Sequence, residues 1–302
     1  MHWSIYKDTE EPVENICYDA THIAKVLSAI DENFPMYFEN FINKKPVRNF
    51  VKVINKAIDE FESDRNIYKE IFDLETLEEY EDDPNAFKSE KLRNKCPVIR
   101  KTLNSKLEEL KKYKKDFNRA DPNELLEKIT SICTFGKDYY EHYDSVTYEG
   151  AKNYLDLELY PLDEEECSLS GVIGVGIKSR ILYKLYPAIF PNESQNSIWT
   201  LYFLSGREDF GCKYDSEFLM IDDEEIVTKQ NFAYPYRLFA YYAFEIYKLL
   251  EREAAKINLP LEKNYRYVAV DAFLSSVAEY HDEDIKLYAR QIANGGFGYG
   301  WS

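Results

Sequence analysis

Two glycines just before a basic, amphipathic helix are the residues of this sequence best suited to holding an anion. Gly174 and Gly176 are separated by one residue, and this spacing predicts a tight turn that leaves backbone N–H groups free at the helix start. Lys178, Arg180 and Lys184 follow shortly afterwards in the same segment. Because free N–H groups and basic side chains both attract negative charge, we expect a phosphate group to bind at this turn.

The residues of this turn also resemble a known DNA-binding motif. The stretch 173–178 (IGVGIK) is similar to the hairpin of the helix-hairpin-helix DNA glycosylase superfamily. In that family the hairpin N–H groups hold a DNA phosphate, and a lysine at the place of Lys178 attacks C1′ of the flipped nucleotide. The stretch 269–271 (AVD) resembles the family segment that carries a catalytic aspartate at a helix start, although Asp271 lies 93 residues beyond Lys178. The resemblance implies an enzyme that binds DNA and excises a base.

Two carboxylates and one lysine are candidates for the chemistry that this resemblance implies. Breaking a glycosidic bond develops positive charge on the sugar, and a carboxylate beside C1′ stabilises that charge. Asp271, placed to cap a helix from Ala272 to about Tyr280, is the first candidate, and Glu193 is the second. Lys178 would be a nucleophile if burial lowered its pKa, and a phosphate contact otherwise.

Each of these candidates also has a purely structural interpretation, which the sequence leaves open. Tyr234 and Tyr236 could stack on a flipped base. However, the chain has 26 tyrosines and 18 phenylalanines, and most aromatic side chains pack in a core. Asp271 and Glu193 could be plain helix N-caps or first-turn acids favoured by the helix dipole, and the Gly174 turn could simply join two packed helices.

Metal and cofactor chemistry has little support in the sequence. Asp222, Asp223, Glu224 and Glu225, followed by Lys229, superficially resemble a metal-dependent nuclease centre, but they are placed like the tip of a hairpin. The four histidines have no metal-ligand spacing, and the five cysteines are far apart and never form C-x-x-C. We therefore expect no metal site and no cofactor, and we expect a reducing cytoplasm.

The charge of the chain restricts its partners. A formal net charge of −17 opposes non-specific attraction to nucleic acid or anionic lipid, so DNA binding needs a local basic patch. The run Lys111–Lys115 could touch nucleic acid, but Glu108, Glu109 and Asp116 lie at pairing distance along the helix, which favours a solvated face. The N-terminus lacks the pattern of an export signal, and no apolar run approaches about 18 residues, so we expect no membrane span.

The elements that would position these residues are mostly helices. Apolar residues recur at helical spacing over most of the chain, and only Phe218–Val227 and Tyr265–Val270 carry a strand signal. We predict a mainly α, multi-helix globular protein with a small β-hairpin and a helix-hairpin-helix-like turn in its C-terminal part. The turn at 118–123 predicts a border between a charged helical subdomain (1–120) and a tyrosine-rich helical domain (121–302).

Three helices of the C-terminal part are expected around the candidate residues. The first follows the glycine turn and ends at Pro187, and the second starts with Asn192 as N-cap and Gln195 in capping-box position. The third, 237–253, is apolar almost all round, as a central buried helix should be.

These observations favour a DNA glycosylase-like enzyme that acts on modified or foreign DNA, in repair or antiphage defence. The main alternative is a non-catalytic interaction protein, or a subunit of a larger complex, whose acidic surface meets a basic partner. A metal-dependent nuclease is the third class. Whether Asp271 and Lys178 line one cleft would best separate these classes.

Overall fold

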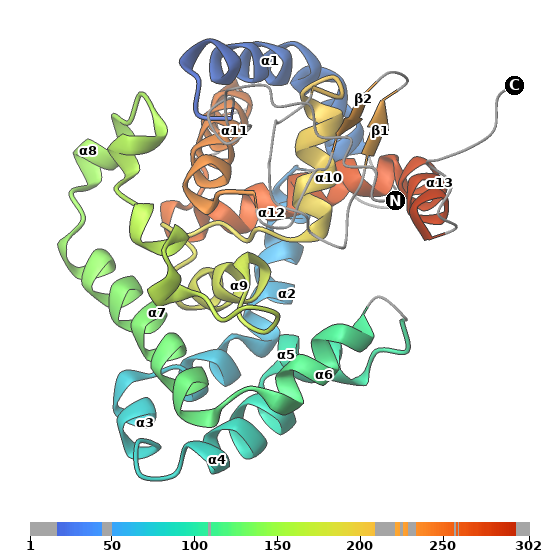
Figure 1. The fold of residues 1–302 in the computed structure, drawn as a ribbon. Helices are drawn as coiled ribbons and strands as arrows, with labels where there is room; N and C mark the ends of the chain where they lie inside the picture. Colours follow the sequence, from blue (N-terminus) through green and yellow to red (C-terminus); the bar gives the residue numbers. More distant parts are fainter. Residues whose placement is uncertain are drawn as a thin grey trace, which may run out of the picture.

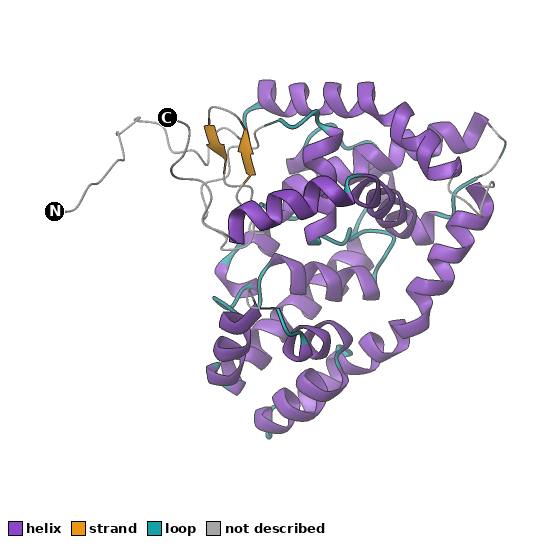
Figure 2. Cartoon of the chain, turned by 90° about the vertical axis from the view of Figure 1, so that its right-hand side faces the viewer, coloured by secondary structure: helices purple, strands orange, loops and turns teal. Residues whose placement is uncertain are grey.

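The computed structural model describes residues 17–43, 50–107, 110–208, 221–223, 226–228, 234–256, 258 and 260–293. This part of the chain is built mainly of helices, which confirms the predicted class (Figures 1 and 2). In chain order the helices are α1 (Ala20–Asn43), α2 (Phe50–Ile71), α3 (Leu74–Glu79), α4 (Pro84–Ala86), the π-helix η2 (Phe87–Lys95), α5 (Pro97–Asn104), α6 (Lys111–Arg119), α7 (Pro122–His142), α8 (Ser145–Glu149), the 3₁₀ turns η4 (Tyr154–Leu157), η5 (Tyr160–Asp163) and η6 (Glu165–Cys167), α9 (Val175–Leu185), α10 (Gln195–Leu204), α11 (Tyr236–Lys256), the 3₁₀ turn η7 (Lys263–Tyr265), α12 (Arg266–Tyr280) and α13 (Asp282–Ala293).

Strand structure is confined to one short pair within the described residues. β1 (Ile221–Asp223) and β2 (Ile226–Thr228) run antiparallel, with Ile221 opposite Thr228. The predicted strand at Tyr265–Val270 is wrong, because these residues form the end of η7 and the first turns of α12. Residues 266–270 are all buried, and a short, wholly buried run looks the same in sequence whether it is strand or helix.

Helix α12 lies at the centre of the fold. It packs against α2, α10, α11 and α1 (Figure 1), and ten of its residues are buried. The ring of Phe273 lies 5.0 Å from that of Phe34 and 5.6 Å from that of Phe41, both on α1. The abundant aromatic residues therefore serve the core at this crossing, as the composition suggests.

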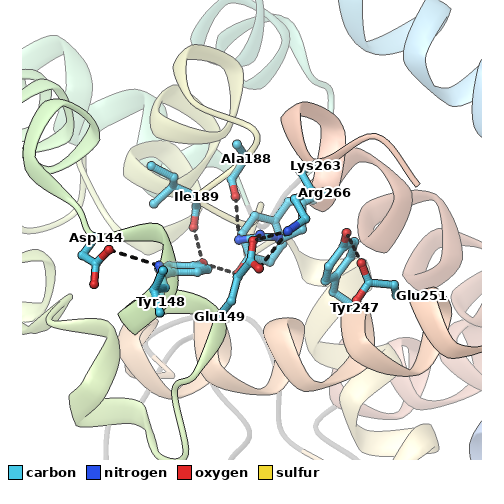
Figure 3. A network of polar contacts seen from close by, with 11 residues as sticks. Asp144, Tyr148, Glu149, Ala188, Ile189, Tyr247, Glu251, Lys263 and Arg266 are labelled. Carbon is cyan, nitrogen blue, oxygen red and sulfur yellow. Dashed lines mark hydrogen bonds and ion pairs between the residues drawn. The ribbon is translucent and has the colours of Figure 1, made fainter. Parts of the chain in front are cut away.

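The first turn of α12 is held by a network that reaches α8 and the segment after α9 (Figure 3). The guanidinium of Arg266, which is buried, donates to the carbonyl of Ala188 at 3.2 Å and to Oε1 of Glu149 at 3.1 Å. The backbone N–H of Tyr267 donates to the carbonyl of Pro187 at 3.0 Å. These contacts fix α12 relative to α9, and the two helices supply most of the candidate residues.

The helix boundaries agree with the sequence in part. α9 and α11 lie where they were predicted. The N-cap of α10 is Ser194, which forms a capping box with Ser197, so the prediction of Asn192 as N-cap is wrong. Asn192 instead uses its side chain for a tertiary contact, as described below. Asp271 is not an N-cap either, because α12 already begins at Arg266.

The predicted border at 118–123 contains a well-formed helix start. Asp121 caps α7 by accepting hydrogen bonds from the N–H groups of Asn123 (2.8 Å) and Glu124 (3.1 Å), with Pro122 in the first turn. A single cluster of buried side chains includes residues from both sides of this turn. The division into two subdomains stays a prediction.

Candidate functional site

Helices α2, α9 and α12 wall a pocket of about 550 Å³, a volume that suits a small ligand or one extruded nucleotide. We call it the central pocket. Phe41 of α1 closes one side, and the other lining residues come from the three helices: Val53, Lys56, Ala57, Glu60, Phe61, Ser63 and Asp64 of α2, Arg180, Tyr183 and Lys184 of α9, and Val268, Asp271, Ala272, Ser275, Ser276 and Glu279 of α12.

Helix geometry decides which residues of α9 reach the central pocket. Arg180, Tyr183 and Lys184 are three and four positions apart, so they lie on one face of the helix. Lys178 stands two positions before Arg180, which places it on the opposite side. The structure therefore brings Arg180 and Lys184 to Asp271, whereas Lys178 does not line the pocket.

Asp271 is the carboxylate at the centre of this arrangement. The side-chain amide of Asn192 donates to its Oδ1 at 2.9 Å, and the Tyr183 hydroxyl bonds to the same carboxyl group. Burial raises the pKa of Asp271 above its ordinary value, while the Asn192 hydrogen bond and the positive charges of Arg180 and Lys184 oppose that rise. The neighbours thus favour the ionised form against the cost of desolvation.

The two basic residues that α9 brings to the central pocket differ in their contacts. Burial alone would lower the pKa of Arg180, but Asp271 and Tyr68 outweigh it, so the pKa is raised and the guanidinium stays charged. Lys184 is 2% exposed; its Nζ lies 2.5 Å from Oδ1 of Asp64 and donates to the carbonyl of Phe61 at 2.5 Å. Burial lowers the pKa of Lys184 despite this ion pair. Lys184 therefore ties α9 to α2, and Arg180 is the cation of α9 that a ligand could reach.

Lys178 faces the protein interior on the other side of α9. It is 4% exposed, and its Nζ donates to the carbonyl of Leu162 and, at 3.2 Å, to Oγ of Ser168. Burial lowers the pKa of Lys178, which is the condition set above for a nucleophile. The amine is nevertheless surrounded by protein, so Asp271 and Lys178 do not share the central pocket.

Glu193, the second carboxylate candidate, lies near Lys178 rather than near Asp271. It is fully buried, and neither carboxyl oxygen has a hydrogen-bond partner among the described residues. Burial raises the pKa of Glu193 well above its ordinary value; Asp163 adds to the rise and Lys178 opposes it. A protonated carboxyl is the form that this environment favours.

The two tyrosines proposed to stack on a base are core residues. Tyr236 is fully buried, and its hydroxyl donates to the carbonyl of Pro191 at 2.9 Å. Tyr234 is 3% exposed and its ring lies 6.5 Å from that of Tyr242. Neither ring lines the central pocket.

The glycine turn precedes α9 directly, with Gly174 as the N-cap. Gly174 has ordinary extended backbone angles, and a Cβ there would meet no atom within 4 Å. The glycine that the backbone requires is Gly171, which has a φ of 74° and faces Oδ2 of Asp116 so closely that a Cβ would lie 2.6 Å from it. The 3₁₀ turn η6 and a turn closed by the Leu169–Ile173 bridge come before α9.

Sequence reasoning missed Asp64, Tyr183 and Asn192 as members of the site. Tyr183 could have been found, because it lies three positions after Arg180 on the same helical face. Asp64 and Asn192 could not, since only the packing of α2 and of the α9–α10 connection against α12 brings them to the central pocket.

A metal site and a membrane span are both without support in the described part of the chain. No group of three or more His, Cys, Asp or Glu side chains there could hold a metal ion. The side chains of Asp222 and Asp223, together with Glu224, Glu225 and Lys229, lie outside the described residues. Among the described helices, none is both long and apolar enough to cross a bilayer. Comparison with protein-family models, with curated proteins and with solved structures finds no match to this chain.

Proposed function

We propose that the chain is a DNA glycosylase-like enzyme whose active site is the central pocket, acting on modified or foreign DNA in repair or defence. The observation that supports this proposal is the meeting of Arg180 and Asp271 in one pocket, although they are 91 positions apart in the chain. Both were selected from sequence as candidates for DNA binding or catalysis. The volume of about 550 Å³ is enough for an extruded base with its sugar.

Asp271 is the carboxylate of the proposed reaction. As the bond between C1′ and the base nitrogen breaks, its electron pair leaves with the base and positive charge develops on the sugar. An ionised Asp271 beside C1′ stabilises that charge, water adds to C1′, and the proton that the water loses neutralises the departing base. Arg180 contributes by favouring the ionised form of Asp271 against the cost of burial, and Asn192 and Tyr183 hold the carboxyl group in place.

Water, rather than a lysine, is the nucleophile in this proposal. Lys178 cannot attack C1′ of a nucleotide in the central pocket, because its amine points to the other side of α9 and is bound by Leu162 and Ser168. Lys184 is bound by Asp64, and Lys56, which also lines the central pocket, pairs with Glu60 at 3.3 Å. We therefore expect simple base release that leaves an intact abasic sugar, without strand cleavage by the enzyme.

The test compares Asp271→Asn with the wild-type protein. Asparagine keeps the shape of the side chain and removes its charge, so melting should change little while base release falls by about 100-fold or more. The assay measures free base and alkali-labile sites from DNA that carries varied modified bases. Glu193→Gln serves as a matched control, since it neutralises a carboxyl group outside the central pocket. Wild-type base release by a stably folded Asp271→Asn protein would reject the catalytic role.

The second candidate function is that of a non-catalytic interaction protein. One observation favours it: four of the nine large apolar side chains that are exposed in the described part of the chain fall within residues 140–160, namely Tyr140, Val146, Leu155 and Tyr160. Exposed apolar side chains that gather on one surface often mark a contact with another protein. A wild-type protein that is inert on every modified DNA, and that self-associates or captures a purified partner through Val146 and Leu155, would favour this alternative.

A further inference from the structure

Positive charge is concentrated in one segment of this acidic chain. Residues 88–119 contain twelve lysines and arginines and four acidic residues, whereas the whole chain has a net charge of −17. These residues form most of η2, all of α5 and all of α6, which lie together below α2 and α9 in Figure 1. Such a segment is the local basic patch that polyanion binding requires in an acidic protein.

The same three elements enclose a second pocket, of about 300 Å³, which we call the basic pocket. Its lining contains three cations, three amides, one apolar side chain and no carboxylate: Arg93, Arg100, Lys114, Asn94, Asn104, Asn118 and Leu103. Guanidinium, ammonium and amide N–H groups are the side-chain donors that bind phosphate oxygens. The central pocket differs from it, since acidic residues stand among its cations.

The three cations of the basic pocket bond to neutral oxygens. Arg93 donates to Oδ1 of Asn118 at 2.6 Å, Arg100 donates to the carbonyl of Asn94 at 3.5 Å, and Lys114 donates to the carbonyl of Ser105. Among the ion pairs of the described residues, none involves these three side chains. Their positive charges are therefore compensated by no described carboxylate, and they remain available to an anion in the pocket.

Two features of the surrounding residues suit this pocket to an anion. The guanidinium of Arg93 lies 5.4 Å from the centre of the Phe117 ring, which holds it in place at the pocket wall. The carboxylate of Asp116 packs against Gly171, outside the lining of the basic pocket. The one described acid in the lysine-rich helix α6 is thus turned to another surface. Glu108 and Glu109, the other acids expected to balance these lysines, lie outside the described residues.

We propose that the basic pocket binds a phosphate group of a DNA backbone. The choice of DNA rests on the proposed function, whereas the phosphate chemistry follows from the three cations alone. α5 packs on α9 and η2 packs on α2, so two elements of the basic pocket contact helices that wall the central pocket. This inference assigns phosphate binding to α5 and α6 instead of the glycine turn.

The test is DNA binding by the double variant Arg100→Gln/Lys114→Gln, measured by fluorescence anisotropy with a labelled oligonucleotide at several salt concentrations. The matched control is Arg252→Gln/Lys256→Gln, which removes the same two charges from α11, where they pair with Asp31 and Glu253. We expect affinity to fall about tenfold or more, and the slope of log K against log salt to decrease in magnitude by about two, in the first variant only. Equal losses in both variants, or in neither, would overturn the proposal.

Two further arms separate the possible outcomes. The exposed single variant Arg100→Gln carries the test if the double variant melts early, with an expected slope change of about one. The second arm measures binding of inorganic pyrophosphate. If the wild-type protein binds pyrophosphate but not DNA, and the Arg100 variant binds neither, DNA is rejected as the ligand. If DNA binding depends on Arg100 and the protein releases no base, this inference is supported and the proposed function is rejected. If base release depends on Asp271 but not on Arg100 or Lys114, the proposed function is supported and this inference is rejected.

Discussion

The side-chain amide of Asn192 donates a hydrogen bond of 2.9 Å to Oδ1 of Asp271, across 79 positions of the chain. This bond joins the connection between α9 and α10 to the second turn of α12. Asn192 is 6% exposed and Asp271 is partly exposed at the wall of the central pocket. The orientation of the carboxyl group therefore depends on a loop residue that is itself held by packing, and this dependence can be measured.

Replacing Asn192 by alanine should raise the pKa of Asp271 further. Burial already raises this pKa, and the Asn192 hydrogen bond is the largest influence that opposes the rise. A raised pKa in the folded state means that Asp271 contributes stability at low pH, and that this contribution is lost as pH rises through the folded-state value. Asn192→Ala should therefore destabilise the protein by about 1–3 kcal/mol near neutral pH, and by less at about pH 3.

The pKa of Asp271 can be followed by ¹³C NMR of its carboxyl carbon, with Asp271→Asn to assign the signal. Tyr183→Phe removes the other hydrogen bond to the same group and should shift the pKa in the same direction. An unchanged Asp271 titration in Asn192→Ala would show that the amide does not control this carboxyl group.

The sequence predicts features that depend on spacing along one helix. Helical periodicity placed α9 and α11, and the residue types at Arg180, Lys184 and Asp271 selected three of the residues that line the central pocket. These features are local, because they follow from spacing along one helix. The pairing of Lys178 with Asp271 failed for the same reason: positions 178 and 180 point to opposite sides of one helix.

The features that the sequence could not supply all depend on packing between distant segments. Glu193 looks like a helix N-cap or first-turn acid in the sequence, yet it is completely buried. The lysines of α6 look balanced by their neighbours, yet Lys114 meets Arg93 and Arg100 from two other elements. Burial and charge compensation are properties of the assembled fold, and a single sequence does not reveal which carboxylates point away from neighbouring cations.

The buried carboxyl group of Glu193 should make the protein less stable as pH rises. Burial raises its pKa well above the ordinary value, and the charged groups that face it are Asp163, which adds to the rise, and Lys178, which opposes it. Its contribution to stability is complete below the unfolded-state pKa and is lost as pH rises through the raised folded-state pKa. Glu193→Gln removes this loss, so the variant should gain stability relative to the wild-type protein as pH increases.

The measurement is thermal melting of both proteins at a series of pH values from about 4 to 9. Asp64→Asn offers a comparison in which the carboxyl group pairs with Lys184 at 2.5 Å, so its removal should destabilise the protein near neutral pH. Parallel melting curves for wild type and Glu193→Gln over the whole range would mean that Glu193 keeps its charge when folded.

Alanine should be tolerated at Gly174 but not at Gly136, although Gly174 belongs to the turn that the sequence predicts to bind an anion. A Cβ at Gly136 would lie 2.4 Å from Cδ2 of Leu182 and 3.3 Å from the ring of Tyr186. Leu182 of α9 is fully buried where α9 packs on α7, so overpacking should outweigh the better helix propensity of alanine and cost about 1–2 kcal/mol. At Gly174 a Cβ meets no atom within 4 Å and φ is −98°. There the weaker N-capping of alanine and the smaller entropy of its unfolded chain offset each other to within about 0.5 kcal/mol.

Urea unfolding of the two variants gives both free energies of unfolding. A larger loss at Gly174 than at Gly136 would show that the glycine turn, rather than the contact between α7 and α9, is the constrained part of this region.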